Sequence, residues 1–374
     1  ALTHTKKANA DQKIVLCGCM VQQEHRLEKI RRSFPYVDLV FGPHELWRFP
    51  ELLEKMYLPH KGRIFQARDI DGERYEGLPV LRAEGVRAWL PVMNGCNNFC
   101  SYCIVPYVRG RERSRAPEDV IEEARGIIAS GHKEIYRLGQ NVNSYGRDLG
   151  GETDFSALLR ELNALDGDFI IRFMTSHPKD ASDRLFETMA ECEKVERHIH
   201  LPFQSGSDRI LREMNRKYTA DHYYALTEKA RSLMPDIAIT SDVIVGFPGE
   251  SEEEFEDTLR LVEKVRFDML FTFIYSPRVG TPAAEMPDPY TREEKQLRFD
   301  RLLELQNGIS EQRQAELVGR VMRVLIDGVG EGSLTARTAC SRLVHVQGEA
   351  SLVGQFKNVL ITESNSWSLK GELT

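Results

Sequence analysis

The segment Asn94-Gly95-Cys96-Asn97-Asn98-Phe99-Cys100-Ser101-Tyr102-Cys103 holds three of the seven cysteines of this 374-residue chain. The spacing is Cys-x3-Cys-x2-Cys, so one loop can present all three thiols to a single centre. Three ligands on a cluster of four irons leave one iron open for chemistry. A structural zinc site needs a fourth ligand, and no Cys or His follows within the next 25 residues. A zinc site completed from elsewhere, or three unrelated buried thiols, are the alternatives.

The composition is that of a globular chain with room for two or three domains. Hydrophobic residues make up 41% and charged residues 29%. No apolar run approaches the roughly 18 residues of a membrane span, and no secretory signal pattern opens the chain. An odd number of scattered cysteines favours metal ligation in a reducing cytoplasm over a disulfide framework. The net charge of -7 argues against general coating of nucleic acid but permits a local basic groove.

An alternation of strands and helices predicts a parallel sheet over residues 86–317. Strands are expected at 86–92, 134–138, 169–174, 198–201, 237–245 and 269–275. Helices are expected at 117–130, 154–165, 180–191, 221–234, 251–265 and 292–317. Six strands alternating with helices indicate an α/β fold, a partial (β/α)6 barrel with its site at the carboxyl ends of the strands. The cysteine triplet directly follows the first strand, so we expect it on that rim.

Smaller segments are expected before and after this barrel in the sequence. Short buried strands and helices over residues 1–60 predict a small α/β domain, which we expect to be incomplete because no cysteine precedes Cys17 and the first residue is not Met. Residues 61–85 are polar and are interpreted as a linker. Residues 318–374 predict an antiparallel β-barrel. Its strands are expected at 320–326, 334–338, 343–346 and 358–363.

The cysteine motif, with Tyr102 before its last cysteine, resembles that of radical S-adenosylmethionine (SAM) enzymes. The run Tyr102-Cys103-Ile104-Val105-Pro106-Tyr107-Val108-Arg109-Gly110-Arg111-Glu112-Arg113-Ser114-Arg115 is more specific. It resembles the methylthiotransferase family, and within it the MiaB-type branch that acts on tRNA. The resemblance extends over about residues 13–373. It implies that Cys96, Cys100 and Cys103 are the catalytic ligands of a 4Fe-4S cluster that binds SAM and cleaves it to generate a radical.

The resemblance also implies a target and a second cluster. The target would be carbon 2 of N6-isopentenyladenosine at tRNA position 37, which receives a methylthio group after the base is unstacked. Gly18-Cys19-Met20-Val21-Gln22-Gln23 is similar to a cluster-binding segment of the family. Cys19 is therefore expected to bind an auxiliary 4Fe-4S cluster, although its two companion cysteines are not visible. Cys17 is interpreted as a strand thiol.

Polar loops after the later barrel strands are expected to hold SAM. Their amides, hydroxyls and carboxylate suit amino-acid and ribose groups, and glycine lets backbone approach a ligand closely. Ordinary loop chemistry is the alternative for each side chain. The predicted cofactor-binding residues are Tyr102, Gln140, Asn141, Gln204, Ser205, Asp242 and Gly246.

Four alternating arginines follow the triplet, and we expect phosphate or carboxylate partners for them rather than a merely solvated face. The end of the chain, Ser366-Trp367-Ser368-Leu369-Lys370-Gly371-Glu372-Leu373, resembles a TRAM domain, an RNA-binding module. The predicted RNA-binding residues are Arg109, Arg111, Arg113, Arg115, Trp367 and Lys370.

The expected partners are the tRNA anticodon arm and an electron donor such as flavodoxin or ferredoxin, with no membrane, for a monomer in the cytoplasm. Sister branches that act on threonylcarbamoyl-adenosine in tRNA or on a ribosomal protein are alternatives. Two further alternatives are a non-catalytic RNA-binding iron-sulfur protein and a radical enzyme that only methylates or cleaves. The missing auxiliary cysteines are the main support for the non-catalytic alternative.

Overall fold

The computed structural model describes residues 2–9, 11–58, 62–67, 77–78 and 80–374. Its contacts divide the chain into two compact units. Unit 1 falls within residues 1–81, 94–99 and 103–112, and unit 2 comprises residues 82–93, 100–102 and 113–374. The cysteine loop therefore contributes residues to both units, between the two-residue strands β5 (Met93–Asn94) and β6 (Arg113–Ser114).

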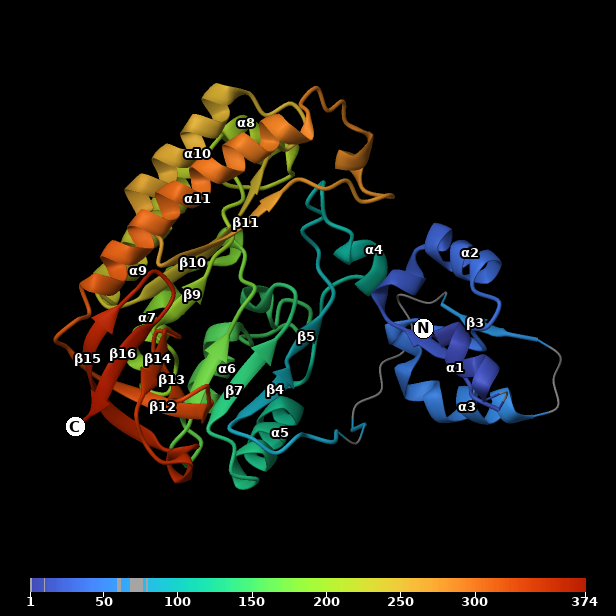
Figure 1. The fold of residues 1–374 in the computed structure, drawn as a ribbon, viewed down its shortest axis with the longest axis horizontal. Helices are drawn as coiled ribbons and strands as arrows, with labels where there is room; N and C mark the ends of the chain where they lie inside the picture. The colour runs from blue at the N-terminus through green and yellow to red at the C-terminus, as the bar shows by residue number, and fades with distance from the viewer. Residues whose placement is uncertain (1, 10, 59–61, 68–76, 79) are drawn as a thin grey trace. The chain divides into compact units, whose positions relative to one another are not determined.

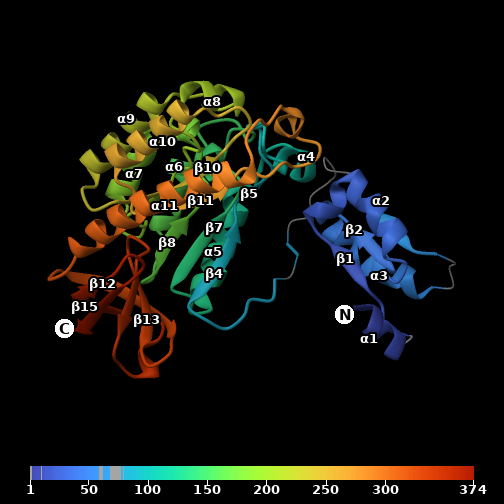
Figure 2. The ribbon, with the colours of Figure 1, turned by 45° about the horizontal axis from the view of Figure 1, so that its top comes forward.

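Unit 1 is built on a parallel sheet of three short strands in the order β1-β2-β3. The strands are β1 (Val15–Cys17), β2 (Leu39–Phe41) and β3 (Ile64–Gln66). Successive β2 side chains point to opposite faces. Val40 joins the apolar cluster of α2 (Glu24–Ser33), whereas Leu39 and Phe41 join that of α3 (Phe49–Tyr57). The expected small α/β layout is present, and Figure 2 shows both helices beside the strands.

Two elements of unit 1 differ from the sequence expectation. Strand β3 lies inside the segment interpreted as a linker and hydrogen-bonds to β2. Residues 61, 68–76 and 79 of that segment lie outside the described residues. A strand of three residues is too short to show the alternation from which strands are predicted. Helix α1 (Leu2–Ala8) was also not expected, and it has no buried residue.

Unit 2 contains the six expected parallel strands, so the predicted partial barrel is confirmed. They pair as β4-β7-β8 and β9-β10-β11, and a bridge between Ile171 and Val195 connects the two groups. The strands are β4 (Arg87–Pro91), β7 (Glu134–Leu138), β8 (Ile170–Phe173), β9 (His198–His200), β10 (Ala238–Val245) and β11 (Met269–Ile274).

Helices cover the outer face of this sheet and enclose its main apolar core. They are α5 (Pro117–Ala129), α6 (Phe155–Asn163), α7 (Asp183–Glu191), α9 (Ala220–Leu233), α10 (Glu252–Val265) and α11 (Arg292–Ala315). Figure 1 shows α9, α10 and α11 outside strands β9, β10 and β11. Ser251 and Thr291 begin α10 and α11 with capping boxes, which satisfy backbone donors at each start. The short helix α8 (Asp208–Glu213) was not expected.

The C-terminal segment closes into a five-stranded barrel in the order β12-β13-β14-β16-β15. The strands are β12 (Val321–Val329), β13 (Leu334–Thr338), β14 (Leu343–Val346), β15 (Phe356–Ser364) and β16 (Leu369–Leu373). The predicted barrel is confirmed, with β16 as an additional strand that runs parallel to β14 and antiparallel to β15. A Cβ on Gly371 would lie 2.3 Å from Val359 Cγ1, so this strand position requires glycine.

Among the helices of the described residues, none is both long and apolar enough to cross a membrane.

Candidate functional site

The first half of the cysteine loop is fixed within unit 1 by its own backbone. Gly95 has φ +76°, and a Cβ there would lie 2.0 Å from the Arg111 carbonyl oxygen. The Cys96 N–H donates to the Gly110 carbonyl at 3.1 Å. Asn97 and Glu112 exchange two hydrogen bonds, each from one residue's backbone N–H to the other's side chain, at 3.1 and 3.2 Å. Glycine at position 95 is therefore required for the loop to fold back on residues 110–112.

Helix α4 (Val105–Arg109) ends at Arg109, the first of the four arginines that follow the cysteine triplet. The Phe99 ring meets Tyr107 edge to face at 5.7 Å, and the Arg111 guanidinium lies 4.5 Å from the Phe99 ring centre. Arg109 Nε donates a hydrogen bond to Cys19 Sγ at 2.9 Å. The structure thus brings together two residues for which the sequence indicated separate roles, a cluster ligand and an RNA contact.

The central part of the loop, residues 100–102, belongs to unit 2. The Ser101 N–H donates to the Met214 carbonyl at 3.0 Å, and the Ser101 carbonyl accepts from the Ala283 N–H at 2.8 Å. Tyr102 packs against an apolar cluster that includes Phe247 and Tyr275. These contacts fix the backbone that directly follows the buried Cys100.

Arg216 links Cys100 to the carboxyl-terminal ends of the barrel strands. Its Nη1 lies 3.5 Å from Cys100 Sγ, its Nη2 donates to the Pro202 carbonyl after β9, and its Nε donates to Tyr218 Oη at 2.7 Å. The side chain is buried. Burial disfavours the guanidinium charge, but Tyr218, Tyr102 and Cys100 together hold the pKa of Arg216 well above its ordinary value. A permanent positive charge therefore lies beside the Cys100 sulfur.

His177, on the loop after β8, contacts the same group of side chains. Its ring meets the Tyr218 ring edge to face at 5.7 Å. Its Nδ1 accepts from the Lys179 N–H at 3.2 Å, while its buried Nε2 has no protein partner among the described residues. Burial and the nearby Arg216 hold the pKa of His177 far below its ordinary value. The neutral ring therefore presents an N–H donor at Nε2.

Other buried polar atoms at the strand ends of unit 2 also lack protein partners within the described residues. They are Ser101 Oγ, Gln140 Oε1, Ser176 Oγ and Gln204 Oε1. Thr175 and Gln204 have φ values of +64° and +69°, which cost energy in residues other than glycine and are often found at functional sites. Buried polar atoms without partners are rare in folded proteins. Their concentration here fits a polar ligand with amino, carboxylate and hydroxyl groups, which is the chemistry of SAM.

The remaining predicted cofactor-binding residues have different surroundings. Asn141 Nδ2 donates to Asp180 at 2.7 Å, and Ser205 Oγ accepts from the Ser207 N–H at 3.2 Å, so both stabilise loops. Asp242 is partly exposed and lies 3.3 Å from His200 Nε2. Gly246 has φ +67°, and a Cβ there would meet the Lys295 side chain at 2.5 Å. Whether these residues contact SAM remains a prediction.

Glu250 fixes the Gly246 turn. Its buried Oε2 accepts from the Gly246 N–H at 2.7 Å, and its backbone carbonyl accepts from Arg298 Nη1 at 2.7 Å. Burial raises the pKa of Glu250 to about 7, although the Gly246 N–H and Arg298 oppose the shift. This carboxyl thus sets the shape of the loop after β10.

The thiols fit the expected cluster in chemistry, because thiolates are the usual ligands of a 4Fe-4S cluster. Cys96, Cys100 and Cys103 form no disulfide in the described part of the chain, and the first two are buried. No group of three His, Cys, Asp or Glu side chains in the described ranges already forms a metal site. For the auxiliary cluster, the sequence offers only Cys17 and Cys19 in this region. Two thiols are fewer than the three that leave one iron open, so these residues alone do not fit the second cluster.

The predicted RNA-binding residues lie in both units. Arg115 donates to the Pro91 carbonyl at 2.7 Å and pairs with Glu123 at 2.7 Å. Trp367 is 67% exposed at a turn in which Asn365 Oδ1 accepts from the backbone N–H groups of residues 367 and 368. Lys370 pairs with Glu363 at the surface, at 2.7 Å. Trp367 thus presents a flat ring to solvent. RNA binding by these residues remains a prediction.

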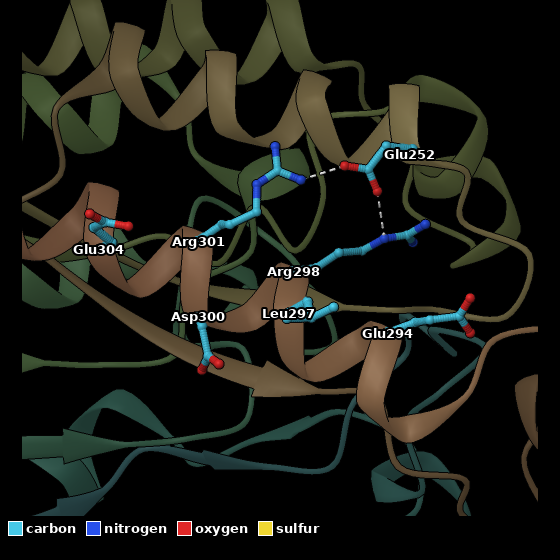
Figure 3. Close-up of a pocket in the computed structure, with 7 residues that line it drawn as sticks. All are labelled: Glu252, Glu294, Leu297, Arg298, Asp300, Arg301 and Glu304. Atoms are coloured by element: carbon cyan, nitrogen blue, oxygen red, sulfur yellow. Dashed lines mark hydrogen bonds and ion pairs between the residues drawn. The ribbon is translucent and has the colours of Figure 1, made fainter.

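A pocket of about 520 Å³ lies along α10 and α11, outside the sheet (Figure 3). Glu252 bridges Arg298, at 3.0 Å, and Arg301, so both arginines that line the pocket are paired. This pairing leaves the pocket without an evident chemical role.

Comparisons with known proteins agree with this geometry. The Radical SAM superfamily profile matches residues 90–262, and the TRAM domain profile matches residues 315–374. A cobalamin-dependent S-adenosylmethionine radical enzyme, OxsB, has a similar fold with a TM-score of 0.53 at 15% identity, over 82% of this chain and 45% of that one. The fold and site therefore define a radical SAM enzyme with a TRAM domain.

Two curated relatives carry the name tRNA-2-methylthio-N(6)-dimethylallyladenosine synthase. The protein of Acetivibrio thermocellus is 50% identical over 98% of this chain and 77% of its own length. That of Carboxydothermus hydrogenoformans is 46% identical over the whole of this chain and 85% of its own length. The chain belongs to this family of radical SAM methylthiotransferases, as the sequence motifs predicted.

Several residues of the site were not predicted from the sequence as site residues. Arg216 acts on Cys100 through a contact between segments 116 positions apart, which leaves no local pattern. Glu250 lies only four positions from Gly246, but its burial depends on the fold. His200 did leave a signal, because the alternation His198-Ile199-His200 in a strand directs two imidazoles to one face of the sheet.

Proposed function

We propose that this enzyme adds a methylthio group to carbon 2 of N6-isopentenyladenosine at position 37 of tRNA. The observation that carries the proposal is the linkage of Cys100, through Arg216 and Tyr218, to the loops after β8 and β9. Buried polar atoms in these loops have no protein partner in the described part of the chain, which supports binding of a polar cofactor at that end of the strands.

Cys96, Cys100 and Cys103 would hold a 4Fe-4S cluster, which together with SAM supplies the one-electron chemistry that an aromatic C–H bond requires. The Arg216 guanidinium would offset the negative charge of the Cys100 thiolate. His177 Nε2–H and the Gln140 and Gln204 amide oxygens would fix polar groups of SAM. Cys19 is the residue that we assign to the family's auxiliary cluster.

The C-terminal barrel would hold the anticodon arm. Single-stranded bases stack on exposed aromatic rings, and Trp367 offers such a ring. Arg109, Arg111, Arg113 and Arg115 follow the cysteine loop and are proposed phosphate contacts. We further propose a cytoplasmic monomer that takes electrons from a flavodoxin or a ferredoxin.

Mass spectrometry of tRNA from a strain that lacks the gene tests the substrate. The 2-methylthio form should disappear and N6-isopentenyladenosine should accumulate, and wild-type chain should restore the modification. Cys100→Ala should fold and bind tRNA but fail to restore it, with Cys340→Ala as a control cysteine on the C-terminal barrel. Unchanged modification in the deletion strain would refute the proposal, and loss of a threonylcarbamoyl-derived nucleoside instead would indicate the sister activity.

A further inference from the structure

Strands β9 and β10 place four polar side chains on one face of the sheet of unit 2. The register pairs His198 with Ala238 and His200 with Thr240. Residues two apart in a strand point the same way, so His198 and His200 lie side by side with Thr240 and Asp242. Both histidines and Thr240 are buried, while the Asp242 side chain is 29% exposed.

These side chains form a continuous chain of contacts that begins at the buried Glu196. Glu196 Oε2 lies 3.4 Å from His198 Nδ1, and His198 Nε2 lies 2.8 Å from Thr240 Oγ1. The same hydroxyl lies 2.9 Å from His200 Nδ1, and His200 Nε2 lies 3.3 Å from Asp242 Oδ1. Each imidazole therefore uses both ring nitrogens, and one hydroxyl connects the two rings.

The number of protons follows from the two kinds of contact in this chain. The two Thr240 contacts are hydrogen bonds, whereas the two carboxylate contacts, at 3.4 and 3.3 Å, are ion pairs that attract when the ring is charged. A proton directed along each of the four contacts makes four, whereas two neutral imidazoles and one hydroxyl supply three. With both carboxylates ionised, one additional proton on either ring completes the chain. The Thr240 hydroxyl then donates to whichever ring is neutral. An imidazolium between the two carboxylates therefore satisfies every contact.

The buried end of the chain is fixed by the C-terminal barrel. Ser341, in the turn between β13 and β14, donates to Glu196 Oε2 at 3.0 Å and accepts from Arg172 Nη1 at 2.8 Å. Arg172 also contacts Glu196 at 3.2 Å, and the Phe173 N–H donates to Glu196 Oε1 at 2.7 Å. Glu134, which pairs with Arg172, is the other carboxylate at this end.

The opposite end is open. Asp242 is partly exposed, and the neighbouring Phe271 ring lies 5.6 Å from the His200 ring, edge to face. Phe271 is paired with Asp242 in the register of β10 and β11, and its side chain is exposed. A carboxylate next to an exposed aromatic ring is suited to a flat ligand with a hydrogen-bond donor at its edge.

We propose that Glu196, His198, Thr240 and His200 are positioning residues that hold Asp242 as an ionised acceptor for an N–H or O–H group of a bound nucleoside. This inference rests on the proposed function, because the nucleoside is either the adenosine part of SAM or the target adenosine of tRNA. The C-terminal barrel then has a second role, since its Ser341 turn fixes the buried end of the chain.

The pair Thr240→Val and Thr240→Ser tests the connection without touching either carboxylate. Valine has the shape of threonine but lacks the hydroxyl, and serine retains it. Binding to the full chain is measured in two arms, SAM on the cluster-loaded protein and an anticodon stem-loop that carries N6-isopentenyladenosine on the metal-free protein. Thr240→Val should weaken binding of one of these two ligands about tenfold, as for loss of a hydrogen bond to a charged group. Thr240→Ser should remain within about threefold.

The ligand whose binding is weakened, SAM or the stem-loop, identifies the nucleoside that Asp242 contacts. Asp242→Asn should weaken the same arm by a similar factor, and the double variant with Thr240→Val should be no worse than Asp242→Asn alone, because both changes remove one coupled interaction. Unchanged affinity in both arms for folded Thr240→Val would overturn the proposal, as would strictly additive effects.

Nitrogen NMR of the metal-free full chain with 15N-labelled histidine gives a readout that does not depend on activity. The ring nitrogen shifts of both His198 and His200 should change in Thr240→Val and should stay close to the wild-type values in Thr240→Ser. Ring shifts that do not respond to Thr240→Val would overturn the proposal. If the wild type bound neither nucleoside, the proposed function would fail, while the ring signals would still decide whether the proton-sharing chain exists.

Discussion

Arg109 Nε donates a hydrogen bond to Cys19 Sγ at 2.9 Å, although 90 positions separate the two residues. Helix α4 and the 3-10 turn η1 (Cys19–Gln22) are therefore neighbours within unit 1. The guanidinium brings a permanent positive charge to a sulfur that the family resemblance assigns to an auxiliary cluster.

Replacement of Arg109 by leucine should slow alkylation of Cys19 in the metal-free chain by about 3- to 10-fold. The thiolate is the reacting form, and a contact with a cation favours it. Mass spectrometry after timed exposure to iodoacetamide gives the rate at each cysteine. Arg111→Leu is the matched control, because that guanidinium lies over the Phe99 ring instead. Equal rates in both variants would contradict a functional contact.

Arg172→Met should destabilise the protein by about 3–5 kcal/mol, the usual effect of breaking a buried ion pair. Arg172 is fully buried and pairs with Glu134 and Glu196, so its removal takes a guanidinium away from two buried carboxylates, of which Glu134 retains Arg87. Urea unfolding measures the loss. Arg323→Met, at an exposed pair with Asp168, should cost less than about 1 kcal/mol. A similar small loss for both variants would show that the buried network contributes little to stability.

Glu250 should make stability fall as the pH rises from about 4.5 to 7. Burial raises its pKa to about 7 in the folded protein, so the unfolded chain loses its proton first and is favoured as the pH increases. The stabilising contribution is complete below about pH 4.5 and is lost as the pH passes 7, a change of about 3 kcal/mol. Glu250→Gln should remove this component of the pH profile, whereas Glu263→Gln on the exposed side of α10 should retain it. If the pH profile of stability for Glu250→Gln ran parallel to that of the wild type, Glu250 would not be the source of this component.

The sequence predicted the elements that have strong periodicity, and it missed those that depend on distant contacts. The six barrel strands repeat with helices, so their order followed from the pattern. Arg137 shows the limit, because it occupies a core position on β7 between the rings of Phe155 and Phe173, at 5.5 and 5.8 Å. No local pattern indicates that aromatic faces will surround a buried arginine.

The candidate site also combines local features that the sequence predicted with distant contacts that it did not. The cysteine spacing predicted which thiols belong together, since it is a local property of a loop. The contact of Arg216 with Cys100 joins residues 116 positions apart and became visible only in the structure. The assignment of Cys96 and Cys100 to different compact units was equally inaccessible from sequence.

Gly95→Ala should impair iron incorporation, whereas Gly150→Ala should not. Both glycines have nearly the same left-handed φ, +76° and +75°, so the backbone strain of about 1–2 kcal/mol is matched. The two positions differ in the room around the glycine. A Cβ at 95 would lie 2.0 Å from the Arg111 carbonyl oxygen, whereas a Cβ at 150 would meet nothing within 4 Å. Iron per chain after anaerobic reconstitution, compared at equal fractions folded, isolates this clash. Full iron incorporation in Gly95→Ala would show that the loop can adjust.

Trp367→Ala should weaken binding of an anticodon stem-loop by about 1–3 kcal/mol, the range for loss of one stacked base. The indole is 67% exposed, and Asn365 holds its turn through two 2.8 Å hydrogen bonds, so a ring at this position is presented without a large entropic cost on binding. Trp367→Phe keeps a smaller flat ring and should recover part of the affinity. Because stacking carries no charge, Trp367→Ala should leave the salt dependence of binding unchanged, whereas loss of a phosphate contact would reduce it. Affinity measured at several salt concentrations separates these cases, and an unchanged affinity for Trp367→Ala would place the RNA elsewhere on the protein.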